Sequence, residues 1–116
     1  MCKICSQSDL LSWRNIREDL KKFIHQIDAK FNLQKIILHG SFAKGDYHEN
    51  SDIDLIIIGD FRGRIFDRIG EVLKYAPKGL TIEPFVYTPD EFKSMKDNNN
   101  PFIMNALSTG IEILSH

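Results

Sequence analysis

The chain has 116 residues, of which 42% are hydrophobic and 27% are charged, and its formal net charge at pH 7 is −1. This length predicts one compact domain covering residues 1–116, with no room for a second. The near-neutral charge gives no general attraction for nucleic acid, so we do not expect free DNA or RNA as a partner. No segment has the roughly 20 apolar residues that a membrane span needs, and the N-terminus lacks a signal-peptide core, so we expect a cytoplasmic protein.

The only two cysteines, Cys2 and Cys5, form a C-x-x-C pair near the N-terminus. Such a pair is half of a zinc site at most, and the surrounding pattern of a redox motif is absent. We therefore assign neither a metal nor a redox role to these cysteines.

The first predicted element is a long amphipathic helix from about Asp9 to Phe31, in which apolar residues recur every three or four positions. Asn32 is a suitable terminator for this helix. The short apolar stretch Lys35–His39 then predicts a strand that ends at Gly40-Ser41.

The second predicted strand follows two carboxylates, Asp52 and Asp54. The continuous apolar run Leu55–Ile58 indicates a strand buried on both faces. Because side chains alternate along a strand, both carboxylates should share one face while Ile53 points away. The polar residues 45–51 before this strand predict an exposed loop.

The junction after the first strand has the features of a phosphate-binding turn. Gly40 lets the backbone approach a ligand closely, and Ser41 offers both a hydroxyl and an amide. A helix opening at Phe42–Lys44 would add its N-terminal amides, and Lys44 would add a positive charge.

The following segment predicts a helix, from Ile65 to about Ala76, closed by residues 77–79. Its apolar stripe consists of Ile65, Phe66, Ile69, Val72, Leu73 and Ala76. Three arginines accompany this helix, and we expect Arg62, Arg64 and Arg68 to form its solvated face, with contact to a triphosphate or an acidic partner as the alternative.

A third strand is predicted from about Leu80 to Tyr87, and Pro84 within it indicates a short, bent or edge strand. Thr88 and Glu91 then form a capping-box pattern for a helix that runs to about Lys96. This pattern explains Asp90 and Glu91 as helix-start acids rather than metal ligands.

The last predicted elements follow the break at residues 97–100. A helix should begin at Pro101 and end near Gly110, and the alternating residues 111–114 should form a final strand.

The central motifs read LHGSFAKG at residues 38–45 and SDIDL at residues 51–55. Together, at this spacing, they closely resemble the minimal nucleotidyltransferase domains of the DNA polymerase beta superfamily, and in particular those of antitoxin type. The resemblance implies an α/β (α+β) fold, in which helices pack on a small mixed β-sheet. It also implies a third metal-site carboxylate on a later strand.

Glu83 is the candidate for this third carboxylate, because it stands mid-strand between apolar neighbours. An unpaired carboxylate would be costly to bury there, and a metal or a solvent cleft would relieve that cost. The alternative is an ordinary surface glutamate on an exposed strand face.

The resemblance further implies metal-dependent transfer of a nucleoside monophosphate, AMP from ATP by preference, to an acceptor hydroxyl. Asp52, Asp54 and Glu83 would hold two Mg²⁺ ions, while Gly40, Ser41 and Lys44 would bind the phosphates of the nucleoside triphosphate. The implied acceptor lies on a partner protein such as a HEPN-type toxin. Two alternatives stay open: a non-catalytic module that neutralises a partner by docking, and a small-molecule transferase like the aminoglycoside nucleotidyltransferases.

Overall fold

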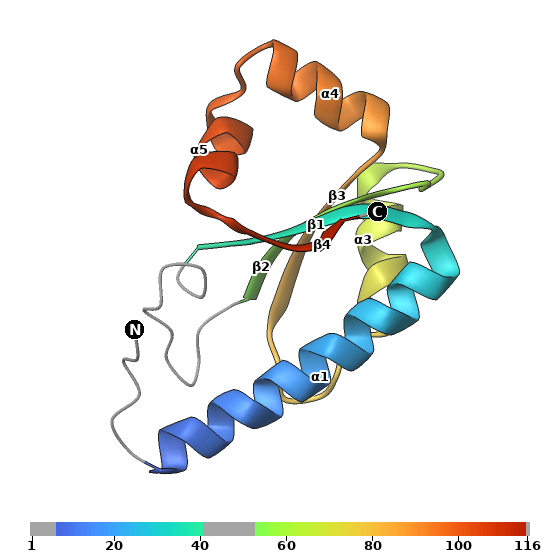
Figure 1. The fold of residues 1–116 in the computed structure, drawn as a ribbon. Coiled ribbons are helices and arrows are strands. Elements are labelled where there is room, and N and C mark those ends of the chain that lie inside the picture. Colours follow the sequence, from blue (N-terminus) through green and yellow to red (C-terminus); the bar gives the residue numbers. More distant parts are fainter. Residues whose placement is uncertain (1–6, 41–52, 116) are drawn as a thin grey trace.

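The chain folds, in a computed structural model, into a four-stranded sheet with helices on both faces (Figure 1). The structure describes residues 7–40 and 53–115, with side chains from residue 18 onward. In chain order the described elements are α1 (Gln7–Phe31), β1 (Leu33–His39), β2 (Ile53–Gly59), α3 (Ile65–Leu73), β3 (Ile82–Tyr87), α4 (Pro89–Asp97), α5 (Pro101–Thr109) and β4 (Ile111–Ser115). This arrangement confirms the predicted α+β class. None of the helices in these ranges is long and apolar enough to cross a membrane.

The sheet is mixed, with the strand order β3-β2-β1-β4. Strand β1 runs antiparallel to β2 and β4, whereas β2 and β3 are parallel. Residues 55–58 of the inner strand β2 are fully buried, as their continuous apolar run predicts. β3 lies at an edge, which is where a sheet tolerates a proline such as Pro84, since proline has no backbone N–H to donate.

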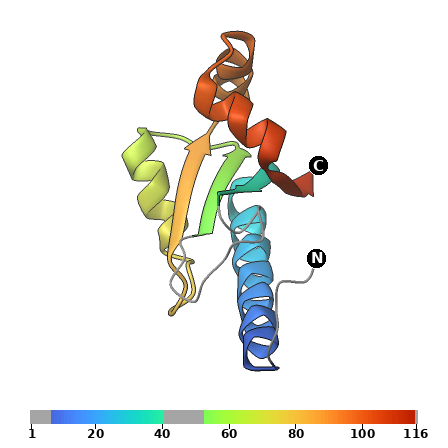
Figure 2. The ribbon, with the colours of Figure 1, turned by 90° about the vertical axis from the view of Figure 1, so that its left-hand side faces the viewer.

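Two apolar clusters fill the space on either side of the sheet. Helices α1 and α3 cover one face and α4 and α5 cover the other (Figures 1 and 2). Because side chains alternate along β2, Leu55 and Ile57 face α1 and α3, while Ile56 and Ile58 face α4 and α5. The face under α4 and α5 is therefore also the face of Asp54.

The helix boundaries follow the expected local signals. Asn32 ends α1 in a left-handed conformation with φ +51°, and its N–H donates to the carbonyl of Asp28. The capping box of α4 is present: the Thr88 hydroxyl accepts from the N–H of Glu91 at 3.2 Å, and the Glu91 carboxylate accepts from the N–H of Thr88 at 2.9 Å. Asn100 caps the start of α5 with its side chain.

The apolar stripe predicted over α3 is only partly covered. Val72 is fully buried, but Ile65, Phe66 and Leu73 are 43%, 86% and 41% exposed. The described helix has only nine residues and packs beside the edge strand β3, so one narrow side of it reaches the core.

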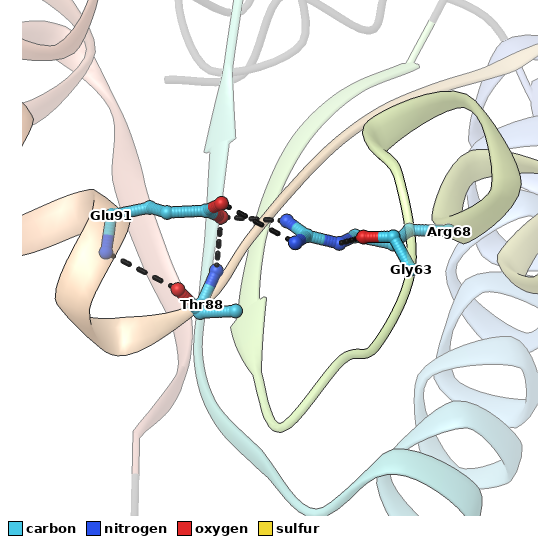
Figure 3. A network of polar contacts seen from close by, with 4 residues as sticks. All are labelled: Gly63, Arg68, Thr88 and Glu91. Atoms are coloured by element: carbon cyan, nitrogen blue, oxygen red, sulfur yellow. Dashed lines mark hydrogen bonds and ion pairs between the residues drawn. The ribbon is translucent and has the colours of Figure 1, made fainter.

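The expectation that all three arginines around α3 form a solvated face is wrong for Arg68, which is 8% exposed. Its guanidinium donates to both carboxylate oxygens of Glu91, at 2.6 and 3.3 Å, and its Nε donates to the carbonyl of Gly63 at 3.0 Å (Figure 3). Arg62 and Arg64 are exposed, as predicted. Arg68 therefore joins α3, the turn before it and the start of α4, which fixes α4 relative to the rest of the fold.

Gly110 ends α5 for a reason that differs from the predicted one. Its φ of −82° is ordinary for any residue, so no left-handed cap is present. A Cβ built on Gly110 would instead overlap the carbonyl oxygen of Ala106 in the helix itself, and it would lie 2.8 Å from Cγ2 of Ile37 and 2.9 Å from the carbonyl oxygen of Leu38 on β1. The absence of a side chain lets the helix end lie directly on β1.

This close approach predicts that Gly110→Ala lowers the free energy of unfolding by about 1–3 kcal/mol, because neighbouring backbone must shift to admit the methyl group. Urea unfolding followed by circular dichroism measures the change. Gly70→Ala is the matched control, since a Cβ at Gly70 in α3 meets nothing within 4 Å. The control should be neutral or stabilise the helix by about 0.5–1 kcal/mol. Equal effects of the two substitutions would contradict the packing argument.

Candidate active site

Three strands bring polar residues together at one end of the sheet. His39, the last residue of β1, is the register partner of Asp54 on β2, and Asp54 is in turn the register partner of Glu83 on β3. Register partners on neighbouring strands point to the same face. All three residues therefore form a row across the sheet on its α4 and α5 face.

Asp54 and Glu83 are the two predicted metal-site carboxylates that the structure brings together. Neighbouring strands lie about 4.8 Å apart, so the side chains at these paired positions leave the sheet side by side. Asp54 is half-buried, whereas Glu83 is exposed. This exposure matches the alternative of a glutamate on an exposed strand face, so no burial cost argues for a bound metal at Glu83. Its pairing with Asp54 is what supports a role in the site.

Gly40 is required at this end of the sheet on two independent grounds. Its φ of +78° lies in the left-handed region that L side chains rarely adopt. A Cβ built on Gly40 would also overlap Oδ2 of Asp54 and lie 3.3 Å from its Cγ. The backbone at the end of β1 therefore lies directly against the carboxylate of Asp54.

An aromatic cluster that the sequence analysis did not identify lies beside the carboxylate pair. The ring of His39 lies 5.8 Å from that of Phe85 and 5.3 Å from that of Phe102, and the two phenylalanine rings are 5.0 Å apart. Phe102 belongs to α5, so this cluster connects the helix to the end of β1. Aromatic spacing along the chain could not have shown it, because the three residues come from three distant elements.

His39 is neutral at pH 7 in this setting. Burial lowers the pKa of its imidazole below the ordinary value of 6.5, and the negative charge of Asp54 acts in the opposite direction but with less effect. Its Nε2 atom is buried and accepts or donates no hydrogen bond within the described parts of the chain. The ring that packs against Phe85 and Phe102 is therefore uncharged at neutral pH.

The remaining predicted site residues, Ser41, Lys44 and Asp52, lie outside the described residues, as do the predicted helix start at Phe42 and the loop of residues 45–51. Within residues 7–40 and 53–115, no group of three or more His, Cys, Asp or Glu side chains could hold a metal ion. Carboxylate oxygens at Asp54 and Glu83 suit a hard cation such as Mg²⁺, which binds few carboxylates and takes its other ligands from water and phosphate. The carboxylates of Asp54 and Glu83 are thus of the kind that Mg²⁺ binds, and Asp52 is the expected further ligand.

The sequence of residues 19–108 matches the family model of the nucleotidyltransferase domain. The chain belongs to this nucleotidyltransferase family. Two proteins of Methanocaldococcus jannaschii, both named as candidate protein adenylyltransferases, are similar to it. One is 36% identical over 103 residues, which cover 83% of this chain and 95% of that protein. The other is 44% identical over 105 residues, which cover 84% of this chain and 98% of that protein.

Solved structures support the nucleotidyltransferase fold. A candidate nucleotidyltransferase of Sulfolobus solfataricus superposes with a TM-score of 0.69 at 19% identity, over 99% of this chain and 94% of that one. A toxin–antitoxin structure with AMP-PNP superposes with a TM-score of 0.54 at 16% identity, over 81% of this chain and 72% of that one. The predicted resemblance to nucleotidyltransferases is confirmed.

Proposed function

We propose that this nucleotidyltransferase transfers AMP from ATP to a hydroxyl group on a partner protein, in a reaction that depends on Mg²⁺. The observation that carries the proposal is the register pair of Asp54 and Glu83 beside the backbone of Gly40. Protein as the acceptor class is supported by the two Methanocaldococcus jannaschii relatives, which are named as candidate protein adenylyltransferases and match over nearly their full length.

In the proposed reaction, the acceptor oxygen bonds to the α-phosphorus of ATP while the bond from that phosphorus to the pyrophosphate oxygen breaks. Asp52, Asp54 and Glu83 would hold two Mg²⁺ ions, which neutralise charge on the phosphate oxygens when bound. Gly40, Ser41 and Lys44 would bind the phosphates. Glu83, exposed on an edge strand, is the carboxylate that an incoming acceptor can reach, so we assign it the proton that leaves the acceptor hydroxyl.

The proposed biological role is that of an antitoxin that modifies a HEPN-type helical toxin. The toxin–antitoxin structure with AMP-PNP shares this fold, which supports the combination of a nucleotide and a protein partner. The described part of the chain forms one sheet with its helices and offers no separate acceptor-binding domain. A macromolecular acceptor that brings its own surface to the site therefore suits this fold better than a free small molecule.

Transfer is tested with ATP labelled at the α-phosphate and, in parallel, at the γ-phosphate. The acceptor to be tested is the product of a neighbouring gene, with a small helical protein as the expected kind. Adenylylation predicts label on the acceptor from α-labelled ATP only, and removal of Mg²⁺ by EDTA should abolish it. Label from γ-labelled ATP would indicate phosphorylation instead and would overturn the proposal.

A docking module without catalysis is the competing function. Isothermal titration of MgATP against the wild type and an Asp52→Asn/Asp54→Asn variant separates the two. A catalytic site predicts binding by the wild type and its loss in the variant. If the partner is never labelled and the variant still neutralises it, the docking function is correct and the enzyme proposal fails.

Asp54→Asn alone should reduce the transfer rate at least about a thousandfold, because it removes a charged metal ligand while keeping the shape of the side chain. Initial rates with α-labelled ATP measure the loss, and circular dichroism checks that the fold persists. Asp60→Asn is the matched control. Asp60 is exposed and follows the opposite end of β2, so its substitution should leave the rate within about twofold.

A further inference from the structure

The aromatic cluster of the candidate active site lies where the apolar core under α4 and α5 meets the carboxylate pair. Phe85 on β3 packs against this core and is the register partner of Ile56 on β2, which is fully buried. Glu83 and Asp54, each two residues earlier, form the next pair on the same face of the sheet. Phe102 of α5 contacts the cluster but is 37% exposed, so part of its ring is open to a ligand.

The three rings of the cluster are held in place before any ligand binds. Their centroids are 5.0–5.8 Å apart, within the range of about 4.5–7 Å that aromatic pairs favour. Ile103, the neighbour of Phe102 on α5, is fully buried and fixes this part of the helix on the sheet. Because the imidazole of His39 is uncharged at neutral pH, the whole cluster is a neutral aromatic surface. Phe102 has the most exposed ring of the three.

The in-line geometry of the proposed reaction directs the nucleoside toward this surface. The acceptor and the pyrophosphate lie on opposite sides of the α-phosphorus, so the ribose and the base leave that line at an angle. Gly40, assigned to the phosphates, ends β1, and Glu83, assigned to the acceptor, is on β3. The reaction line therefore runs across the sheet, over Asp54 on the intervening β2. A direction at right angles to it runs along the strands, and the aromatic cluster lies there.

We propose that the nucleobase of the bound nucleotide stacks on the exposed ring of Phe102. This inference rests on the proposed nucleotidyl transfer, because it uses the places assigned there to the phosphates and the acceptor. An aromatic ring accepts any base, since every base has a π-face, and a purine covers more of the ring than a pyrimidine does. Phe102 therefore contributes affinity for the nucleoside and a preference for purine nucleotides.

Isothermal titration of the intact chain with MgATP and with the magnesium complex of tripolyphosphate tests the proposal, because tripolyphosphate has the phosphates but no base. The wild type should bind MgATP more tightly than tripolyphosphate. Phe102→Ala should weaken MgATP binding about five- to a hundredfold and leave tripolyphosphate binding within about twofold. Phe102→Tyr keeps the ring and should stay within about threefold of the wild type for MgATP. The wild type should also prefer MgATP to MgUTP, and Phe102→Ala should remove this preference.

Leu107→Ala is the matched control, because Leu107 is also 37% exposed on α5 but lies about 140° around the helix from Phe102. It should bind both ligands as the wild type does. Unchanged MgATP binding by Phe102→Ala, or an equal loss in Leu107→Ala, would overturn the proposal. Equal weakening of both ligands by Phe102→Ala would also overturn it, since the ring would then support the phosphate site rather than the base.

The wild type separates failure of this inference from failure of the proposed function. If it binds tripolyphosphate as tightly as MgATP, the stacking proposal is wrong while the proposed transfer is untouched. If it binds neither ligand, the proposed function is contradicted, and the assignment of Phe102 to the nucleobase fails with it.

Discussion

Gly40→Ala is expected to reduce the rate of nucleotidyl transfer at least about a hundredfold, because displacement of a catalytic group by about 1 Å is sufficient for such a loss. The added methyl group would occupy the position of Oδ2 of Asp54 and push the carboxylate away from its partner Glu83. Initial rates with α-labelled ATP measure the effect.

The control must separate this displacement from backbone strain. Gly79 has the same left-handed conformation, with φ +89° against +78° for Gly40, but a Cβ built there meets nothing within 4 Å. Both substitutions should cost about 1–2 kcal/mol of stability, since alanine is strained in this conformation. Only Gly40→Ala should lose activity. Equal activity of the two variants would contradict the assignment of Asp54 to the active site.

Glu91→Gln is expected to lower the free energy of unfolding by about 2 kcal/mol, because it leaves the buried guanidinium of Arg68 without its charged partner. The Arg68 side chain is 9% exposed, and its bond to Glu91 is 2.6 Å long. The Glu91 side chain is 40% exposed, so solvent screens the pair and the loss should fall below that for a fully buried ion pair. Urea unfolding of the wild type and of Glu91→Gln measures the loss of stability.

Glu71→Gln is the matched control for this pair. Glu71 and Lys74 form an ion pair of 3.0 Å on the surface of α3, with side chains 49% and 67% exposed. Exposed pairs contribute little, so the control should change stability by less than about 0.5 kcal/mol. If the two substitutions have equal effects, Arg68 does not depend on Glu91 for its burial.

The same pair predicts a pH dependence of stability. The hydrogen bond from Arg68, more than the bonds from Thr88, lowers the pKa of Glu91 in the folded state below its ordinary value of 4.5. A carboxylate with a depressed pKa stabilises the fold above the unfolded-state pKa, and this contribution is lost as the pH falls through the folded-state pKa. The stability difference between wild type and Glu91→Gln should therefore be constant from pH 7 to about 5 and shrink below about 4.5. A difference that grows on acidification would contradict this sign.

Local patterns in the sequence predicted the helices and strands that the structure describes, together with part of the candidate site. The apolar run of residues 55–58 predicts a strand buried on both faces, and the Thr88 and Glu91 capping box predicts the start of α4. Both signals depend on neighbours within four residues, which the chain order already contains. The turn at Gly40 and the start of the strand at Asp54 can likewise be predicted from the residues next to them in the sequence.

The tertiary structure alone decided which distant residues meet. Glu83 becomes a candidate site residue because the parallel register of β2 and β3 pairs it with Asp54, and it is exposed because β3 is an edge strand. Arg68 is buried only because α4 places Glu91 opposite it. Strand register and edge position are set by the packing of whole elements, and periodicity along the chain does not contain that information.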